Sequence, residues 1–302
     1  MILRDWVSGN HILFAGPEGR TLVDTGYGGQ VERTLALLRQ PANLGDERLD
    51  RVINTHCHSD HMGANARLKR EYGCSISVPA GEGPLVERWD ERGMWLSWTD
   101  QICERFTCDD LIEPGSPLSL GGAEWRALEA PGHDMNALMF HCPEHGLLIS
   151  GDALWENGLG IVLTEDQSAG FRAARATLDN IAGLDVRAVI PGHGAPFREV
   201  SRALDRAYRR ADAFEADPLK AAGHYLKVML MFALQEKGRM RLDDLPNLLD
   251  RVAFYREYNQ RFFRLPPATL ADRMVSELER GLAARREDGW LLPGAQGRSA
   301  RG

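Results

Sequence analysis

The chain has few cysteines and no long hydrophobic run. Its 302 residues include five cysteines, an odd number without the spacing of a disulfide framework. We therefore expect reduced thiols and a cytoplasmic location. No stretch approaches the ~18 apolar residues needed to cross a membrane, and the N-terminus carries charges where a signal peptide has its apolar run. These absences argue against a secreted, disulfide-stabilised or membrane-embedded protein.

An excess of positive charge is also missing. The chain has 36 Lys and Arg against 43 Asp and Glu, which gives a formal net charge of −7. This balance disfavours a polyanionic substrate unless the basic side chains gather on one face. We therefore expect a small-molecule substrate, with no membrane partner and no nucleic acid. A homodimer is compatible with the composition.

One short segment concentrates residues that bind metals. Residues 55–61 read Thr-His-Cys-His-Ser-Asp-His and follow a short apolar stretch that is typical of a buried strand. His56 and His58 are two positions apart, so in an extended loop their side chains project the same way. Asp60 and His61 follow where the chain should turn into a helix beginning near residue 62. Imidazoles with a carboxylate suit Zn, Mn or Fe, and their spread suits two adjacent ions better than one.

Three further segments show the same order of strand, small residues and ligand-type residue. Predicted strands at residues 124–129, 147–151 and 186–190 lead to His133, Asp152 and His193. The small residues in each turn, Pro-Gly or Ser-Gly, let the backbone bend sharply. Each of these side chains should therefore stand at the rim of a sheet.

In this order the motifs resemble those of the metallo-β-lactamase-fold hydrolase superfamily, His-x-His-x-Asp-His followed by His, Asp and His. The resemblance covers about residues 10–200 and includes a glyoxalase II-like ligand set. It implies a first metal held by His56, His58 and His133, a second held by Asp60, His61 and His193, and a bridge between them from Asp152. It also implies two divalent ions, with Zn first and Fe or Mn as alternatives.

Two residues are expected to support these ligands without binding metal. Asp24, within the sequence Leu-Val-Asp-Thr-Gly, matches the superfamily's early aspartate, which orients the motif loop. Cys57 lies between two of the proposed ligands, but its side chain should point the opposite way from theirs. We expect Cys57 to have a supporting or packing role.

Strand and helix patterns alternate over the first two-thirds of the chain. A hairpin is predicted at residues 11–24, a helix at residues 29–40 and a strand at residues 75–79. The resemblance implies an α/β fold, an αββα sandwich of two mixed β-sheets with outer helices. We expect this domain to span residues 1–200.

The remainder of the chain differs in character. Helices are predicted at residues 203–215, 219–236, 242–251 and 267–286, and residues 282–292 resemble the wing of a winged-helix unit. We expect an α-helical, winged-helix-like extension over residues 201–293 and a disordered tail over residues 294–302. The extension could serve as a packed cap or dimer surface. It could instead close one side of the metal cleft and so restrict the size of the substrate.

The sequence is least informative about the substrate pocket. Candidate pocket residues are Trp89, Trp95, Trp98, Trp155, His224 and Tyr225. The first three indoles could bind an apolar acyl or ring group, or they could lock a surface loop. Trp155, close after the bridging aspartate, is better placed to form a wall of the pocket. The His-Tyr pair could hydrogen-bond a substrate oxygen or simply pack within its helix.

The resemblance implies a hydrolase in which a metal-activated hydroxide attacks a carbonyl carbon. Asp60 would be the catalytic residue that orients the hydroxide and carries a proton. Thioester hydrolysis fits the ligand set, and ester or lactone hydrolysis fits nearly as well. True β-lactamases are exported and usually lack an aspartate at the position of Asp152. We therefore do not expect antibiotic hydrolysis, despite the name of the superfamily. The alternatives are an RNA or phosphodiester nuclease of the same fold, a mononuclear-iron sulfur dioxygenase, and a non-enzymatic ligand-binding or sensor protein.

Overall fold

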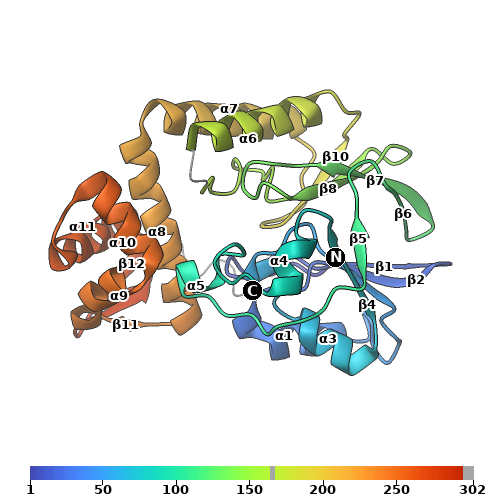
Figure 1. Cartoon of the computed structure of the whole chain (residues 1–302), viewed down its shortest axis with the longest axis horizontal. Helices are drawn as coiled ribbons and strands as arrows, with labels where there is room; N and C mark the ends of the chain where they lie inside the picture. Colours follow the sequence, from blue (N-terminus) through green and yellow to red (C-terminus); the bar gives the residue numbers. More distant parts are fainter. Residues whose placement is uncertain (164–166, 295–302) are drawn as a thin grey trace. The chain divides into compact units, whose positions relative to one another are not determined.

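The computed structural model describes residues 1–163 and 167–294 (Figure 1). These residues form two compact units. Unit 1 consists of Met1–Met94 and Ile102–Glu215, and unit 2 consists of Trp95–Gln101 and the residues from Ala216 onward. Apart from Gly294, the predicted disordered tail lies outside the described residues.

Unit 1 contains two five-stranded mixed sheets. The strands of the first sheet, in spatial order, are β1 (Ile12–Gly16), β2 (Gly19–Val23), β3 (Arg51–Ile53), β4 (Ser75–Pro79) and β5 (Asp110–Ile112). Strands β1 and β2 form an antiparallel hairpin, whereas β2 to β5 run parallel to one another. The carboxyl ends of β2 and β3 therefore meet at the same edge of the sheet.

The second sheet is mostly antiparallel. Its strands, in spatial order, are β10 (Ala188–Pro191), β9 (Leu147–Gly151), β8 (Leu138–Cys142), β7 (Ala123–Glu129) and β6 (Pro117–Leu120). Only β9 and β10 are parallel, so their carboxyl ends lie side by side. The residues that follow these two strands are consequently brought next to each other.

The apolar faces of the two sheets pack together to form the core of unit 1. Val23 and Ile53 from the first sheet belong to the same buried cluster as Trp125, Phe140 and Ile149 from the second. Burial alternates along β7, which is the pattern of a strand with one face inside the protein. Each Å² of apolar surface removed from water stabilises the fold by about 25 cal/mol.

Helices cover the outer faces of both sheets (Figure 1). Helices α1 (Val31–Leu38) and α3 (Asn65–Tyr72) lie on the first sheet, and α6 (Gln167–Ala182) and α7 (Val200–Ala216) lie on the second. The shorter helices of unit 1 are η1 (Gly28–Gln30), α2 (Ser59–Met62) and α4 (Gly83–Arg88). This arrangement confirms the predicted αββα sandwich.

Unit 2 is mainly helical. Its elements are α5 (Leu96–Thr99), α8 (Pro218–Lys237), β11 (Met240–Arg241), η2 (Leu242–Asp244), α9 (Leu245–Arg251), α10 (Ala253–Tyr258), the π-helical η3 (Asn259–Phe263), α11 (Pro267–Arg280), β12 (Ala284–Glu287) and β13 (Trp290–Pro293). The strands form a small antiparallel sheet in the order β11-β13-β12. Among the described residues, no helix combines the length and hydrophobicity needed to cross a membrane.

The predicted wing is a β-hairpin in the structure. Strands β12 and β13 are joined by Asp288 and Gly289, whose φ angles of 49° and 79° are both positive, as a two-residue type I′ turn requires. The helix predicted over residues 267–286 is therefore too long. It ends at Arg280, because residues 284–287 pair with β13 and take an extended conformation.

Candidate metal centre

Loops at the carboxyl ends of strands from both sheets bring the predicted ligand residues together. His56 and His58 follow β3, Asp60 and His61 lie in α2, His133 follows β7, Asp152 follows β9, and His193 follows β10. Helix α2 begins at Ser59, earlier than the sequence predicts, because His58 is extended and its carbonyl accepts from the amides of His61 and Met62 at 3.0 and 3.1 Å. The helical turn at α2 separates Asp60 and His61 from the extended pair before them.

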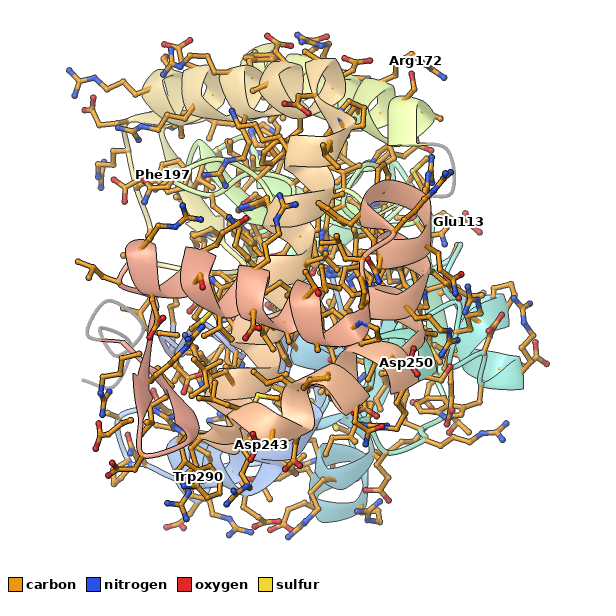
Figure 2. The ribbon with its side chains drawn as sticks, turned by 90° about the vertical axis from the view of Figure 1, so that its left-hand side faces the viewer. Glu113, Arg172, Phe197, Asp243, Asp250 and Trp290 are labelled. Carbon is orange, nitrogen blue, oxygen red and sulfur yellow. The ribbon has the colours of Figure 1, made fainter. Side chains whose placement is uncertain are left out.

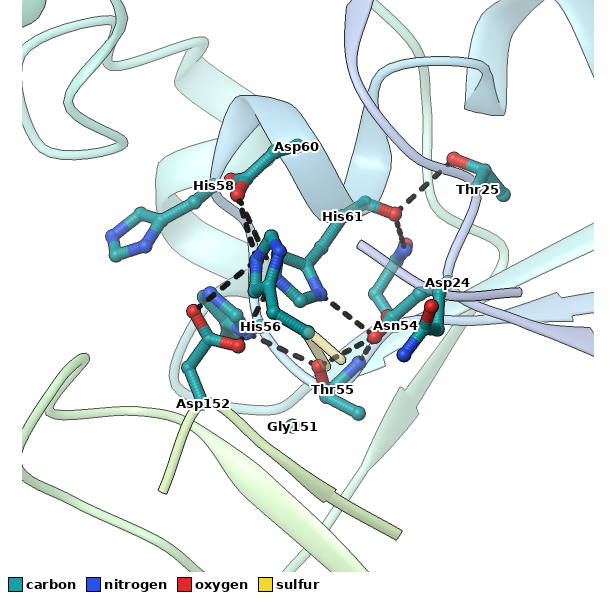
Figure 3. Close-up of polar contacts among 12 residues, drawn as sticks. Asp24, Thr25, Asn54, Thr55, His56, His58, Asp60, His61, Gly151 and Asp152 are labelled. Carbon is teal, nitrogen blue, oxygen red and sulfur yellow. Dashed lines mark hydrogen bonds and ion pairs between the residues drawn. The ribbon is translucent and has the colours of Figure 1, made fainter. Parts of the chain in front are cut away.

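The ligand-type atoms form three overlapping groups whose members lie within 4.8 Å of one another. The groups are His56, His58 and His133; His56, His61 and Asp152; and Asp60, His61 and His193. The carboxylate of Asp152 faces the histidines of more than one group (Figure 3). Its Oδ1 is 3.5 Å from His61 Nε2, and its Oδ2 is 3.5 Å from His133 Nε2 and 3.7 Å from His193 Nε2.

The buried polar atoms at the centre of these groups fit a cation. His56 Nε2 and His61 Nε2 are buried and have no hydrogen-bond partner in the described part of the chain. Such atoms are rarely left unsatisfied in a native protein, and a metal ion would satisfy both. The donor set of imidazoles and carboxylates suits a divalent ion such as Zn. The site therefore has the composition of a divalent metal site.

Asp24 directly follows β2 and orients the loop of residues 55–61 that carries the histidine motif. Its Oδ1 accepts from the Thr55 amide at 2.9 Å, and its Oδ2 accepts from Thr55 Oγ1 at 2.9 Å and from His61 Nδ1 at 2.8 Å (Figure 3). Because Nδ1 of His61 donates to this carboxylate, Nε2 is the nitrogen left to bind a metal, and it faces the site. Asp24 adopts a left-handed conformation with φ of 57°, a strained geometry that these contacts stabilise.

Two other imidazoles are oriented through their Nδ1 atoms. His133 Nδ1 donates to the carbonyl of Ile161 at 2.6 Å. His56 Nδ1 lies 3.1 Å from Thr55 Oγ1, which itself donates to Asp24. Both rings therefore turn Nε2 toward the centre, as a shared metal site requires.

A buried carboxyl pair that the sequence analysis did not identify lies behind His58. His58 Nδ1 faces His133 at 3.0 Å, while its Nε2 is 3.4 Å from Oδ2 of Asp134. Asp134 is buried and hydrogen-bonds the fully buried side chain of Glu82. The position of Asp134, directly after a predicted ligand, was the available signal, whereas Glu82 lies in a distant loop after β4 and offers none.

Burial and the charge of Asp134 raise the pKa of Glu82 well above its usual range. Although burial opposes it, the hydrogen bond from His58 lowers the pKa of Asp134 to about 2. Glu82 is therefore the protonated member of the pair and Asp134 the charged one. Glu82 also hydrogen-bonds Cys57, so this thiol points away from the ligand atoms and toward the carboxyl pair. Burial raises the pKa of Cys57 well above its usual range, which keeps the thiol neutral.

The other ligand-type groups also perturb one another. Although burial opposes it, the carboxylates of Asp152, Asp24 and Asp60 raise the pKa of His61 well above its usual range. Burial and the neighbouring imidazoles lower the pKa of His56 well below its usual range. Without an ion, the carboxylates therefore keep a proton on His61 while His56 stays neutral, and a bound cation would take the place of that proton.

The candidate pocket residues are divided between the two units. Trp155 is at the centre, where its Nε1 donates to Asp152 Oδ1 at 3.2 Å and its ring lies 5.2 Å from that of His193. Trp89, also in unit 1, packs edge-on against Phe106. The remaining candidates belong to unit 2 and are Trp95, Trp98, His224 and Tyr225.

Within unit 2, Trp98 donates from Nε1 to Glu257 at 2.8 Å and packs edge-on against Phe254. These contacts hold α5 against α10, as expected for an aromatic cluster that fixes a loop. Tyr225 is buried within α8. A role for these side chains in substrate binding stays a prediction.

The sequence of this chain is similar to those of known proteins. Residues 4–193 match the family model of the metallo-beta-lactamase superfamily. The chain is 31% identical over 114 residues to a hydroxyacylglutathione hydrolase of Hyphomonas neptunium, a match covering 38% of this chain and 37% of that protein. It is 28% identical over 177 residues to a protein of the same name from Rhodospirillum rubrum, covering 57% of this chain and 60% of that protein. The chain thus matches less than two thirds of the length of either relative.

Among solved structures, the chain is similar to a metallo-beta-lactamase family protein from Thermus thermophilus. The TM-score is 0.53 at 22% identity, and the match covers 94% of this chain and 93% of that one. At this identity the likeness concerns the fold. Because the family model matches more than half of the sequence, and the two-sheet sandwich carries the motif residues at one edge, this chain belongs to the metallo-beta-lactamase superfamily.

Proposed function

We propose that this protein is a hydrolase that uses two divalent ions, zinc first, to cleave a small thioester, ester or lactone. The observation that carries this proposal is the position of Asp152. Its two oxygens face imidazoles from different ligand groups, so one carboxylate can serve both ions. His56, His58 and His133 would hold the first ion, and Asp60, His61 and His193 the second.

Divalent ions bound there would supply a Lewis acid for a carbonyl oxygen and would lower the pKa of a water toward ~7. The chain's own residues supply orientation and proton transfer. Oδ2 of Asp60 is held 3.2 Å from His193 Nε2 and 3.8 Å from His61 Nε2. In this position Asp60 orients the attacking water and takes its proton. Trp155 holds Asp152 through its indole N–H.

The choice of a thioester is supported by the two relatives named hydroxyacylglutathione hydrolase, because a hydroxyacylglutathione is a thioester. The charge of helix α11 agrees with a small substrate. The charged residues of α11 are Asp272, Arg273, Glu277, Glu279 and Arg280, a net charge of −1. A winged-helix nuclease would use such a helix against a polyanion, and a net negative charge there is unfavourable.

A substrate panel with metal analysis tests the proposal. The purified protein, loaded with Zn, Mn or Fe, is assayed against thioesters, lactones, phosphodiesters and a β-lactam, with oxygen consumption followed in parallel. We expect thioester or ester cleavage to exceed phosphodiester cleavage. Asp152→Ala should abolish turnover, while Asp272→Ala, an exposed aspartate on α11, should leave it unchanged. Efficient RNA cleavage, or oxygen consumption with bound iron, would overturn the proposal.

A further inference from the structure

Unit 2 contains a hollow that no part of the proposed hydrolase function uses. It lies between the end of α8, strand β11, helix α9 and the first residue of β13, and its volume is about 340 Å³. Small-molecule sites in proteins occupy roughly 300–1,000 Å³. The hollow is therefore large enough for a ligand of nucleotide size. All of its lining residues belong to unit 2.

The hollow is positively charged in a chain that is negative overall. Its lining includes Lys237, Arg239, Arg241 and Arg251 against a single carboxylate, that of Asp244. The whole chain, in contrast, has a formal net charge of −7. Cations gathered on one side of an acidic protein favour an anionic ligand at that place.

Two of these cations are already paired, and two are available. Arg251 donates to the carboxylate of Asp100 from Nη1 and Nη2, at 3.1 and 2.8 Å. Arg241 lies 3.6 Å from the carboxylate of Asp243 in the neighbouring η2 turn. In the described part of the chain, neither Lys237 nor Arg239 forms an ion pair, although the charge of Lys237 acts on Asp100. Lys237 and Arg239 therefore retain donors for a ligand.

Trp290 holds the guanidinium of Arg239 in place. The Arg239 guanidinium lies over the indole at 4.3 Å from the ring centroid, and that of Arg241 lies at 5.3 Å. Trp290 is itself fixed, because it pairs with Arg241 across strands β11 and β13 on the face shown in Figure 2. A stacked guanidinium keeps the N–H donors at its edge free for a phosphate. The donor is thus oriented before a ligand arrives, which lowers the entropic cost of binding.

The rest of the lining is apolar or neutral. Met240 and Leu248 are buried and supply apolar surface, and the exposed amide of Asn247 supplies both a donor and an acceptor. A ligand with one strongly anionic end and one flat or apolar end fits this combination. A guanidinium can donate two parallel hydrogen bonds to a phosphate, so arginine side chains favour phosphate over an anion with a single acceptor atom.

We propose that this hollow binds a phosphate-bearing small molecule of nucleotide size. The phosphate contacts Lys237 and the edge of Arg239, and the flat part of the ligand lies on Met240 and Leu248. This proposal is independent of the hydrolase proposal, because none of the proposed metal ligands lines the hollow.

Calorimetric titration of the full-length protein with ADP, inorganic pyrophosphate and adenosine tests the proposal. We expect ADP and pyrophosphate to bind saturably, adenosine to bind much more weakly, and added salt to weaken ADP binding. Because ADP can also bind metal ions, the same titrations are run with Asp152→Ala. That variant should bind ADP as the wild type does.

Substitutions locate the site. Lys237→Ala combined with Arg239→Ala should raise the Kd for ADP at least about tenfold. Arg239→Lys keeps the charge but loses the fork, and should give a smaller loss. Arg209→Ala, an exposed arginine on α7, is the matched control and should leave the Kd unchanged. Because these side chains are exposed, the melting temperature of each variant should stay close to that of the wild type.

Three results would overturn the proposal. The first is the absence of saturable ADP or pyrophosphate binding. The second is binding that is lost in Asp152→Ala but kept in the double variant, which would place the ligand at the metal centre. The third is tight binding of a single-stranded RNA through Lys237 and Arg239 without binding of ADP, which would make the surface a nucleic-acid contact.

Discussion

At the scale of single residues, Asp134 orients His58, a proposed metal ligand, without binding the metal itself. Its carboxylate lies 3.4 Å from His58 Nε2, which leaves Nδ1 of the same ring for a metal. Removing the side chain that hydrogen-bonds a metal-binding histidine typically costs about 10–100-fold in metal affinity. Asp134→Ala should lower Zn affinity by that factor, whereas Asp134→Asn, which can still accept from Nε2, should lose less.

Competition with a coloured chelator measures the affinity of these variants. Asp272→Ala serves as the control, since that aspartate is exposed on α11. If Asp134→Ala binds Zn as tightly as the wild type does, the positioning role assigned to Asp134 is wrong. Melting temperatures recorded on the metal-free proteins separate a loss of orientation from a loss of fold.

Cys57 lies between two proposed ligands and yet takes no part in the chemistry assigned here. The thiol is fully buried and hydrogen-bonds Glu82. Cys57→Ala should leave turnover within a few-fold of wild type and lower the free energy of unfolding by about 1 kcal/mol through the lost hydrogen bond. Activity assays and denaturant unfolding check both values. A loss of turnover with metal and fold intact would contradict this assignment.

At the scale of elements, the sequence predicts most strands of the two sheets but misses one long helix. The strand expected at residues 75–79 is β4, and that expected at residues 124–129 is β7, because apolar patterns of these lengths suit strands between two sheets. Our prediction omits α6. Its buried face includes Phe171 and Leu178 but also Gly170 and Ala174, whose small side chains weaken the helical pattern.

The turn of the wing hairpin is an element that its sequence determines locally. Gly289 has φ of 79°, a conformation that costs a β-branched residue roughly 1–2 kcal/mol. Gly289→Val should therefore lower the free energy of unfolding of unit 2 by that amount, while Asp288→Asn, which tolerates positive φ, should be neutral. Denaturant unfolding measures the difference. A Gly289→Val protein as stable as wild type would show that the turn adopts another geometry.

At the scale of the whole molecule, the proposed ligands are spread from residue 56 to residue 193 and meet only through the order of strands in two sheets. The sequence alone predicts these residues as ligands, because each follows a predicted strand and stands in a motif. The side chains that orient them were harder to find. Glu82 and Ile161 act through a side-chain contact and a backbone carbonyl, neither of which leaves a pattern in the sequence.

Removal of metal should consequently affect several distant loops of unit 1 together. A ligand that binds only the folded state stabilises it by about 4 kcal/mol at 1,000 times its Kd. We expect close to two Zn per chain in the wild type, at most one in Asp152→Ala, and a chelator that lowers the melting temperature reversibly. Elemental analysis and thermal melting with re-added Zn provide these measurements.

Hydrogen exchange then shows where the stabilisation acts. On chelation, amides near His56, His133, Asp152 and His193 should exchange faster together, because each loop loses a shared ion that holds it to the others. The amides of helix α9 should keep their rates, since that helix contains none of the proposed ligands. If only the loop after β3 responded, a single ion bound within that loop would explain the data, and the bridging role of Asp152 would have to be abandoned.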